Sequence, residues 1–377
     1  MRKKLWIVLL AAFVALFGCE RRPLEGMYSS TIRVIVKCIW TVEMYPGGQK
    51  PSGMTMYFFR DGNFYNTVTT SNVDSCEVQL PPGHYKMFMI SQSPEEYWKM
   101  QFSHMNSFED AALTLRKNAA PTWAVRTGLD DPVVENPEVL CAGISDEFDV
   151  TTEMVEDYQF YATRLRKLQM SKNNNSNTTR AGELPETDEE KDYKERIEYY
   201  TIRIPIHPRN VVSQLEVTIY AGNADVLKSV RASMSGMART YELTKDMTGD
   251  DTAIQIISQW TRTMDSSVER IGHVDGIITT FGLPHGETPS AVRDSSLNVS
   301  ALLIDDSTVA DYIFSIGDKI QMLPPNEGYR ALYKVVFGTA SAPMIVLPDV
   351  KPPSTGGGGF VAAVDDWDEE VEANLLL

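Results

Sequence analysis

Side chains that could do catalytic chemistry are scattered through this sequence without the spacing that catalysis needs. Ser235 lies in SMSGMA, which lacks the first glycine of a nucleophile elbow, so a strand with a turn explains it. The glycines at 356–359 have no Lys-Ser/Thr after them and predict a hinge rather than a phosphate loop. The histidines share no H-E-x-x-H pattern and no His/Cys spacing: His84, His104, His207, His273 and His285. We therefore expect no enzyme activity, no metal site and no cofactor.

Cys19 is the residue with the clearest covalent chemistry. It follows three cations at 2–4 and an apolar run at 5–17, which is too short for the roughly 20 residues that span a bilayer. Such a segment is typical of an export signal, and LFGC at 16–19 resembles the lipobox that lipoprotein signal peptidase recognises. We predict cleavage between Gly18 and Cys19 and acylation of Cys19. The alternative is an ordinary signal in which the cysteine is incidental.

Charge and the residue after Cys19 indicate the compartment and the partners. By resemblance to sorted lipoproteins, Glu20 favours the outer membrane, with the surface or the periplasmic face left open. The net charge of −16 becomes −19 once the three cations at 2–4 are removed. A surface this acidic repels nucleic acid and anionic head groups, and no basic patch is evident. We expect attachment to the outer membrane through lipid and no nucleic-acid partner.

Three further cysteines follow Cys19. Cys38 and Cys76 lie on the expected core faces of strands, so a disulfide between them is one interpretation. The other is that Cys38, Cys76 and Cys141 are small buried hydrophobic residues. No C-x-x-C spacing supports a metal site.

Strand periodicity begins at residue 31. TIRVIVKCIW alternates apolar residues on one face, and MTMYFFRDGNFY predicts a hairpin turning at Asp61-Gly62. CEVQLPPGHYKMFM predicts a strand, a Pro-Pro-Gly turn and a strand. Alternation resumes after residue 197, with a hairpin that turns at 305–307, where the acids serve as turn formers. These patterns predict an all-β protein built of sandwiches.

Three stretches depart from this pattern. Ser107 and Asp110 resemble a capping box and predict a short helix or helical turn within 103–118. The text at 147–165 is strand-like, with its register left open. Residues 171–196 are almost entirely polar and predict a linker or exposed loop, the most protease-sensitive part of the chain, or alternatively a flexible hairpin inside one domain.

These boundaries predict the following organisation: a signal peptide at 1–18, a lipidated tether at 19–30, an N-terminal β-sandwich domain at 31–170, the linker at 171–196 and a C-terminal β-sandwich domain at 197–377. The last domain ends in a strand behind the glycine hinge. Its odd positions form an apolar face opposite a row of acids: Val361, Ala363, Trp367, Val371, Ala373, Leu375 and Leu377. This segment either completes a sheet of its own domain or adds to the sheet edge of a partner.

Two short patterns indicate surface chemistry. The turn at Glu95, Glu96, Tyr97 and Trp98 could offer carboxylates and an aromatic platform to a sugar, or simply pack at a sheet edge. Thr252 and Ser307 follow aspartates in a three-residue pattern that some anaerobic Gram-negative bacteria O-glycosylate.

The order of these motifs resembles a lipoprotein family within the fimbrillin-like superfamily of Bacteroidales, which includes anchor and accessory subunits of type V pili. The matching text is the lipobox, IRVIVKCIW, V-x-L-P-P-G-x-Y, SMSGMA, ITTFG and the terminal GGGGF…DDW…V. The resemblance implies two tandem transthyretin-like (Ig-like) β-sandwich domains without a catalytic site. It also implies a lipid-anchored fimbrial subunit that acts through β-strand addition to other fimbrial subunits. The alternative is a surface lipoprotein that binds glycan or peptide for an uptake system.

Overall fold

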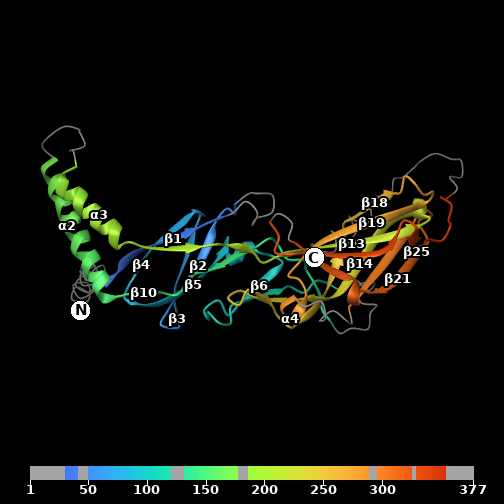
Figure 1. Cartoon of the computed structure of the whole chain (residues 1–377), viewed down its shortest axis with the longest axis horizontal. Coiled ribbons are helices and arrows are strands. Elements are labelled where there is room, and N and C mark those ends of the chain that lie inside the picture. The colour runs from blue at the N-terminus through green and yellow to red at the C-terminus, as the bar shows by residue number, and fades with distance from the viewer. Residues whose placement is uncertain are drawn as a thin grey trace, which may run out of the picture. The chain divides into compact units, whose positions relative to one another are not determined.

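The computed structural model describes residues 30–40, 50–119, 131–176, 186–287, 295–324 and 328–353. Within them the chain consists mostly of strands (Figure 1), which confirms the predicted all-β class. Contacts between residues divide the chain into two compact units. Unit 1 consists of the described residues up to Val36, with Glu77–Tyr85 and Phe148–Ile204. Unit 2 contains the other described residues.

The first strand has the predicted alternation. In β1 (Ile32–Cys38) the buried residues are Ile32, Val34, Val36 and Cys38. This strand lies between β11 (Ile202–Ile206) and β4 (Ser75–Leu80) in one sheet. One apolar face and one polar face are what a half-buried strand requires.

The predicted hairpin at Asp61-Gly62 is also confirmed. It joins β2 (Met54–Arg60) to β3 (Asn63–Thr70), and the turn residues have φ of 50° and 79°. Two positive φ angles match the right-handed twist of the flanking strands. Strands β2 and β3 belong to a sheet of order β12-β9-β5-β2-β3, in which β10 also pairs with β5. The bounds of the others are β5 Gly83–Ser91, β9 Cys141–Ile144, β10 Phe148–Val150 and β12 Arg209–Asn210.

Of the short helix or helical turn predicted within 103–118, the helix does not form, but turns occur at 105–106 and 108–110. Residues 112–115 form the strand β7 (Ala112–Leu115), which pairs with β6 (Met100–Ser103). Leu113 and Leu115 are buried two residues apart, which is strand periodicity. Ser107 Oγ donates to Asp110 Oδ2 at 2.8 Å, so the expected local bond forms within a turn. The sheet order is β16-β15-β7-β6, with β15 Thr240–Glu242 and β16 Met247–Thr248.

Strands were expected at 147–165 and a loop at 171–196, and here the structure corrects both predictions. Apart from β10, the described residues form two helices, α2 (Thr152–Ser176) and α3 (Asp188–Tyr200), which pack together (Figure 1). Thr187 Oγ1 accepts from Glu190 N at 3.2 Å, and Glu190 Oε2 accepts from Thr187 N at 3.0 Å. This reciprocal capping box, together with an ion pair between Lys172 and Glu190, stabilises a helical pair in polar sequence.

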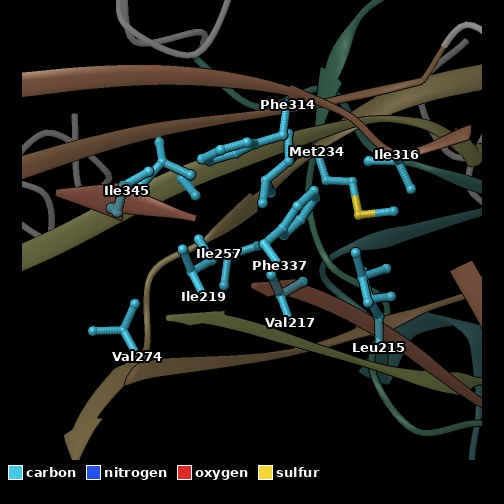
Figure 2. Packing of buried hydrophobic residues seen from close by; sticks show 14 of the residues in the cluster. Leu215, Val217, Ile219, Met234, Ile257, Val274, Phe314, Ile316, Phe337 and Ile345 are labelled. Carbon is cyan, nitrogen blue, oxygen red and sulfur yellow. The ribbon is translucent and has the colours of Figure 1, made fainter. Parts of the chain in front are cut away.

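Two further sheets enclose the largest core of unit 2. One has the order β18-β19-β13-β23-β22, with β24 on β23 and β25 on β13, and the other has the order β21-β20-β14-β17-β8. Their bounds are β8 Val133–Val134, β13 Ser213–Gly222, β14 Leu227–Ala238, β17 Thr252–Ile257, β18 Trp260–Met264, β19 Ile271–Thr280, β20 Ser296–Leu303, β21 Val309–Ser315, β22 Ile320–Leu323, β23 Leu332–Thr339, β24 Ala342–Pro343 and β25 Ile345–Val346. Figure 2 shows side chains from both sheets meeting in this core, including Ile219, Met234, Phe314 and Phe337.

Short helical turns complete the described part: η4 Pro94–Glu96, η5 Ala224–Val226, α4 Pro284–Glu287 and η7 Gly317–Lys319. Strand β13 pairs antiparallel with β19 and parallel with β23. The sandwich is therefore closed by a segment that comes more than a hundred residues later in the chain.

Strand pairing joins residues on both sides of 171–196. Strand β7 pairs with β15, β8 pairs with β17, and β9 pairs with β12. The proposed domain boundaries stay a prediction, but the sheets mix residues of the range 31–170 with residues of the range 197–377. A division into two sandwiches, each with its own part of the chain, does not describe these pairings.

Candidate functional site

The predicted lipidation and strand-donation residues lie outside the described residues. These are Gly18 and Cys19 at one end, and Val361, Ala363, Trp367, Val371, Ala373, Leu375 and Leu377 at the other. Their roles stay predictions. The description of candidate surfaces therefore concerns residues between 30 and 353.

Cys38, Cys76 and Cys141 are buried thiols, and none of the three forms a disulfide in the structure. Cys38 Sγ lies 3.5 Å from Met54 Sδ. Burial raises the pKa of the Cys38 thiol to about 12, with smaller contributions from Cys76 and Asp74. Burial alone raises the pKa of the Cys141 thiol to about 12. These groups remain protonated at neutral pH and have little nucleophilic character.

The two residues of the glycosylation pattern have different surroundings. Thr252 is at the start of β17, where its Oγ1 donates to Asp131 Oδ1 at 2.8 Å. Ser307 is in the exposed turn between β20 and β21, where its Oγ donates to Asp305 Oδ2 at 3.0 Å. Hydrogen bonds from Thr308 and Ser307 lower the pKa of Asp305 to about 2, which confirms that Asp305 is a turn former. Modification of either residue stays a prediction.

The turn at 95–98 presents one aromatic residue rather than a platform of several. Tyr97 is buried, and its hydroxyl donates to Ser91 O at 2.7 Å. Glu95 and Glu96 both accept hydrogen bonds from Ser93. Trp98 is left 77 % exposed.

Glu138 holds the backbone beside Trp98. Its Oε1 accepts from Trp98 N at 3.3 Å and its Oε2 accepts from Lys99 N at 3.0 Å. Because one carboxylate binds two successive amides, the exposed indole is attached to an ordered backbone. A fixed, exposed aromatic ring is a contact that a sugar or a peptide can use.

An aromatic cluster joins α2 to α3 in unit 1 and comprises Phe160, Tyr161, Tyr199 and Tyr200. Ring centroids are 5.0 Å apart for Phe160 and Tyr161, 6.0 Å for Tyr161 and Tyr200, and 5.1 Å for Tyr199 and Tyr200. Phe160 is 47 % exposed and Tyr199 is 79 % exposed. The inner two rings therefore fasten the helices together, while the outer two face solvent.

Cations accompany this cluster along one face of α2. Phe160, Arg164, Lys167 and Met170 follow at spacings of four, three and three residues and are all exposed, so they form a single stripe, which we call the α2 stripe. The Arg164 guanidinium lies 3.9 Å from the centroid of the Phe160 ring. The expectation that the chain has no basic patch is corrected by this stripe.

The signal for this patch is present in the sequence. Between Asp157 and Glu183 there is no acidic residue, although this stretch contains Arg164, Arg166, Lys167, Lys172 and Arg180. Net charge concealed the patch because it averages over the whole chain. Periodicity concealed it as well, because the stretch was expected to be strand followed by loop.

An open depression also lies in unit 1. It is lined by Arg33, Leu165, Lys194, Glu195, Ile197 and Glu198. Arg33 lies 2.7 Å from Glu77 and 3.7 Å from Glu198, and the bond to Glu77 raises the pKa of the guanidinium. Both ion pairs engage the Arg33 guanidinium, so this arginine is not available as a free cation for a ligand.

Three of the five histidines, His84, His273 and His285, lie next to aspartates. His84 Nδ1 lies 2.8 Å from Asp149 Oδ1, and His285 Nδ1 lies 2.5 Å from Asp250 Oδ1. Within the described ranges, no group of three His, Cys, Asp or Glu residues could hold a metal ion. None of the helices in that part of the chain is both long enough and apolar enough to cross a membrane.

The free edge of one sheet is apolar. Strand β21 ends the order β21-β20-β14-β17-β8 and pairs with β20 in the described part of the chain. Val309 is 42 % exposed and Ile313 is 62 % exposed on this strand. An edge strand with exposed β-branched residues is a place where another strand can add.

Several solved structures are similar to this chain. A "putative adhesin" from Bacteroides ovatus has a TM-score of 0.50 and 14% identity, covering 89% of this chain and 99% of that one. The fimbrial anchor protein Mfa2 from Porphyromonas gingivalis has a TM-score of 0.42 and 10% identity, with 81% and 90% covered. A fimbrial assembly protein from Parabacteroides distasonis has a TM-score of 0.30 and 8% identity, with 82% and 92% covered.

The likeness to the Bacteroides ovatus protein extends over most of both chains and shows a shared fold, in agreement with the predicted resemblance to Bacteroidales proteins. No curated protein matches this sequence. The model of the family described as "Domain of unknown function (DUF5119)" matches residues 18–258, which is more than half of the chain. The chain therefore belongs to the DUF5119 family.

Proposed function

We propose that this protein is a lipid-anchored structural subunit of a fimbria on the outer membrane, and that it acts as an anchor or accessory part. The observation that carries the proposal is the fold it shares with the adhesin from Bacteroides ovatus across 89% of its length. The lipobox ending at Cys19 supplies the attachment. A structural role rather than a catalytic one agrees with paired histidines and protonated thiols.

The position of arginines favours an anchor over a shaft subunit. By resemblance, shaft subunits lose an N-terminal strand to an arginine-specific protease. Cleavage after Arg21 or Arg22 would remove only a few residues after Cys19. It would leave β1 intact, because this strand begins at Ile32. Arg180 follows α2 and does not release the first strand alone.

Assembly by strand addition is the finer part of the proposal. Strand β21 supports it because it offers an apolar edge with Val309 and Ile313 exposed. The alternating segment at 361–377 supports it as a donor, because backbone hydrogen bonds give affinity and alternate side chains give register. The partners are other fimbrial subunits.

The lipid anchor is tested with Cys19→Ala. We expect the variant to take up no labelled fatty acid and to be recovered uncleaved or outside the membrane fraction, because acylation needs this thiol. Cys38→Ala is the matched control, since Cys38 is buried and should leave labelling unchanged. Equal label in Cys19→Ala and in the parent rules out the anchor.

Donation is tested with a synthetic peptide of residues 360–377 and a fimbrial subunit that co-purifies with the protein. We expect the peptide to bind that subunit, and Trp367→Asp to weaken binding at least tenfold by placing a charge on the apolar face. Asp366→Asn, on the opposite face, is the control and should bind as the parent does. A peptide that binds only its own truncated chain would show that the strand is structural.

Trp98 supports a second candidate, capture of a glycan or peptide at the cell surface. The Glu138 carboxylate orders the backbone beside an indole that is 77 % exposed. Binding should change the fluorescence of Trp98, and Trp98→Ala should abolish the response, whereas Tyr199→Ala, also highly exposed, should not. Unchanged binding by Trp98→Ala rejects this surface.

A further inference from the structure

We propose that the α2 stripe, Phe160, Arg164, Lys167 and Met170, is a second membrane contact that lies in the phosphate-bearing head-group layer beside the lipid anchor. The inference rests on the proposed anchoring at Cys19. In this proposal the partner of the helical pair is a lipid surface. The contact would also fix how unit 1 is oriented on the membrane.

Uncompensated positive charge is the first step of the argument. Arg164, Arg166 and Lys167 form no ion pair with any described residue, and no acidic residue occurs between Asp157 and Glu183. The chain as a whole has a charge of −16. A basic face on an acidic protein is attracted to phosphates while acidic faces are repelled, so the stripe also favours one orientation.

The acids of α3 do not cancel this charge, because most of them are bonded locally. Lys194 pairs with Glu186 at 2.5 Å and Arg196 pairs with Asp192 at 3.7 Å. The remaining pairs are Lys172 with Glu190, Lys191 with Asp188, Arg203 with Glu198 and the Tyr193 hydroxyl with Glu189. The ion pairs of α3 therefore leave Arg164, Arg166 and Lys167 without a carboxylate as a direct partner among the described residues, and Arg164 interacts with the Tyr193 hydroxyl.

Apolar side chains in the same stripe are the second step. Phe160 is 47 % exposed and Met170 is 58 % exposed, one on each side of the two cations. Aromatic and apolar side chains alternating with Lys and Arg on one helix face are typical of helices that lie in the membrane interface. Tyr199, at the opposite end of the aromatic cluster from Phe160, is a second exposed ring of the kind enriched at head-group depth.

Proximity to the anchor is the third step. Gln159 Nε2 donates to Thr31 O at 2.6 Å, so the residue before Phe160 is bonded to the start of the described chain. Cys19 is twelve residues before Thr31, and a chain of that length reaches at most about 40 Å. The start of the stripe is therefore held within roughly that distance of Cys19, and its end at Met170 lies about 15 Å further along the helix. Tethering raises the effective concentration of head groups, so a weak contact suffices.

A protein partner fits these observations less well. Fimbrial partners would have to supply an acidic groove at the same height above the membrane as the anchor. If Cys19 is acylated, lipid head groups are always present near the anchor, and their phosphates complement the charges of Arg164 and Lys167.

The experiment uses the mature chain from residue 20 to 377, which retains every described residue, with an N-terminal hexahistidine tag bound to nickel-chelating lipid in place of the acyl anchor. Met170→Cys carries an environment-sensitive fluorophore, because the native cysteines are buried. Vesicles contain phosphatidylcholine alone or with phosphatidylglycerol. Emission at position 170 should shift to the blue only with the anionic vesicles, and the shift should decrease with salt.

Two matched variants measure the contribution of the stripe to the docking equilibrium. Arg164→Gln/Lys167→Gln should lower the ratio of docked to undocked protein roughly 25-fold, about fivefold for each cation near the surface. Lys191→Gln/Lys194→Gln removes the same charge from α3 and should change the ratio less than about threefold. Circular dichroism checks that the helix content is unchanged in each variant. A fluorophore at Lys191→Cys shows whether α3 also reaches the lipid or only the α2 stripe does.

Three results would overturn the proposal: no shift on anionic vesicles, an equal loss in both double variants, or a shift produced by a co-purifying subunit rather than by lipid. The tag replaces the acyl group, so these results leave the anchoring of Cys19 untouched. Conversely, a failure to label Cys19 with fatty acid would reject the anchor without affecting the vesicle measurement.

Discussion

Burial is the main cause of the raised pKa of the thiols at positions 38 and 141. The pKa of each is raised to about 12 because ionisation would place a charge in the core. In the unfolded chain a thiol titrates near 8.5 to 9. Between these values the unfolded state releases a proton that the native state retains, so stability falls as pH rises above about 9.

We expect the free energy of unfolding to fall by about 1 kcal/mol per thiol between pH 8 and pH 10, since one pKa unit corresponds to about 1.4 kcal/mol. Urea unfolding at several pH values measures this. Cys38→Ala/Cys141→Ala should be less stable at pH 8 because of lost packing, but its stability should fall less steeply with pH. An unchanged slope would show that other groups cause the alkaline loss.

Tyr97 and Trp98 show what single residues reveal before a structure is known. The sequence indicates that carboxylates and aromatic rings cluster there, and this is correct. It does not show that Tyr97 turns inward to Ser91 or that Glu138, forty residues later, fixes the backbone of Trp98. Which ring is exposed depends on long-range packing, so it could not be read locally.

Strand β14 contains a bulge that depends on one glycine. Its pairing with β17 shifts between Met234 and Met237, and Gly236 has φ of +78°. A Cβ on Gly236 would lie 1.7 Å from Ser295 Oγ. The strand thus needs a residue without a side chain here for two reasons, its backbone angle and its neighbour.

We expect Gly236→Ala to lower the free energy of unfolding by roughly 2–4 kcal/mol, from left-handed strain and overlap together. Adding Ser295→Gly should restore only the part due to overlap. Gly222→Ala in β13, whose Cβ would meet Val346 Cγ2 at 3.3 Å, should cost less than about 1 kcal/mol. Equal effects of Gly236→Ala and Gly222→Ala in denaturant titrations would contradict the strain at the bulge.

Elements whose stability is local were predicted well, and those that depend on a distant partner were not. The β2–β3 hairpin follows from Asp61-Gly62 and its alternating neighbours. Strand β7 was mistaken for a helix because Ser107 and Asp110 resemble a capping box; β7 pairs with the nearby β6 on one side and with β15, more than a hundred residues away, on the other. Helix α2 contains aromatic residues that favour strands, and its packing on α3 decides the outcome. The Thr187-to-Glu190 capping box was a readable sign of α3.

Cleavage by trypsin tests how the halves of the whole molecule are joined. The candidate sites are Lys172, Arg180, Lys191, Lys194 and Arg196. All except Arg180 lie within α2 or α3, so cleavage there requires a helix to open. We expect the first cut at Arg180, identified by mass spectrometry of the fragments.

The two fragments should remain together after that cut. Strands β7, β8 and β9 pair with β15, β17 and β12 from beyond the cleavage site, so sheets hold the nicked chain. Gel filtration should give one species of unchanged size, and a denaturing gel should give two. Arg180→Gln is the control and should delay both fragments. Separation without denaturant would favour independent domains at 31–170 and 197–377.

The parallel pairing of β13 with β23 also decides when this protein can fold. Strand β13 is a central strand of its sheet, yet one of its neighbours is the segment at 332–346, near the end of the described chain. Closing so long a loop is slow, and until it closes β13 presents an open edge and apolar side chains. A chain that is still being translated or exported therefore has no complete sandwich. We expect folding to finish only after synthesis. The interval between the synthesis of β13 and that of β23 would then set how long a chaperone must protect the chain.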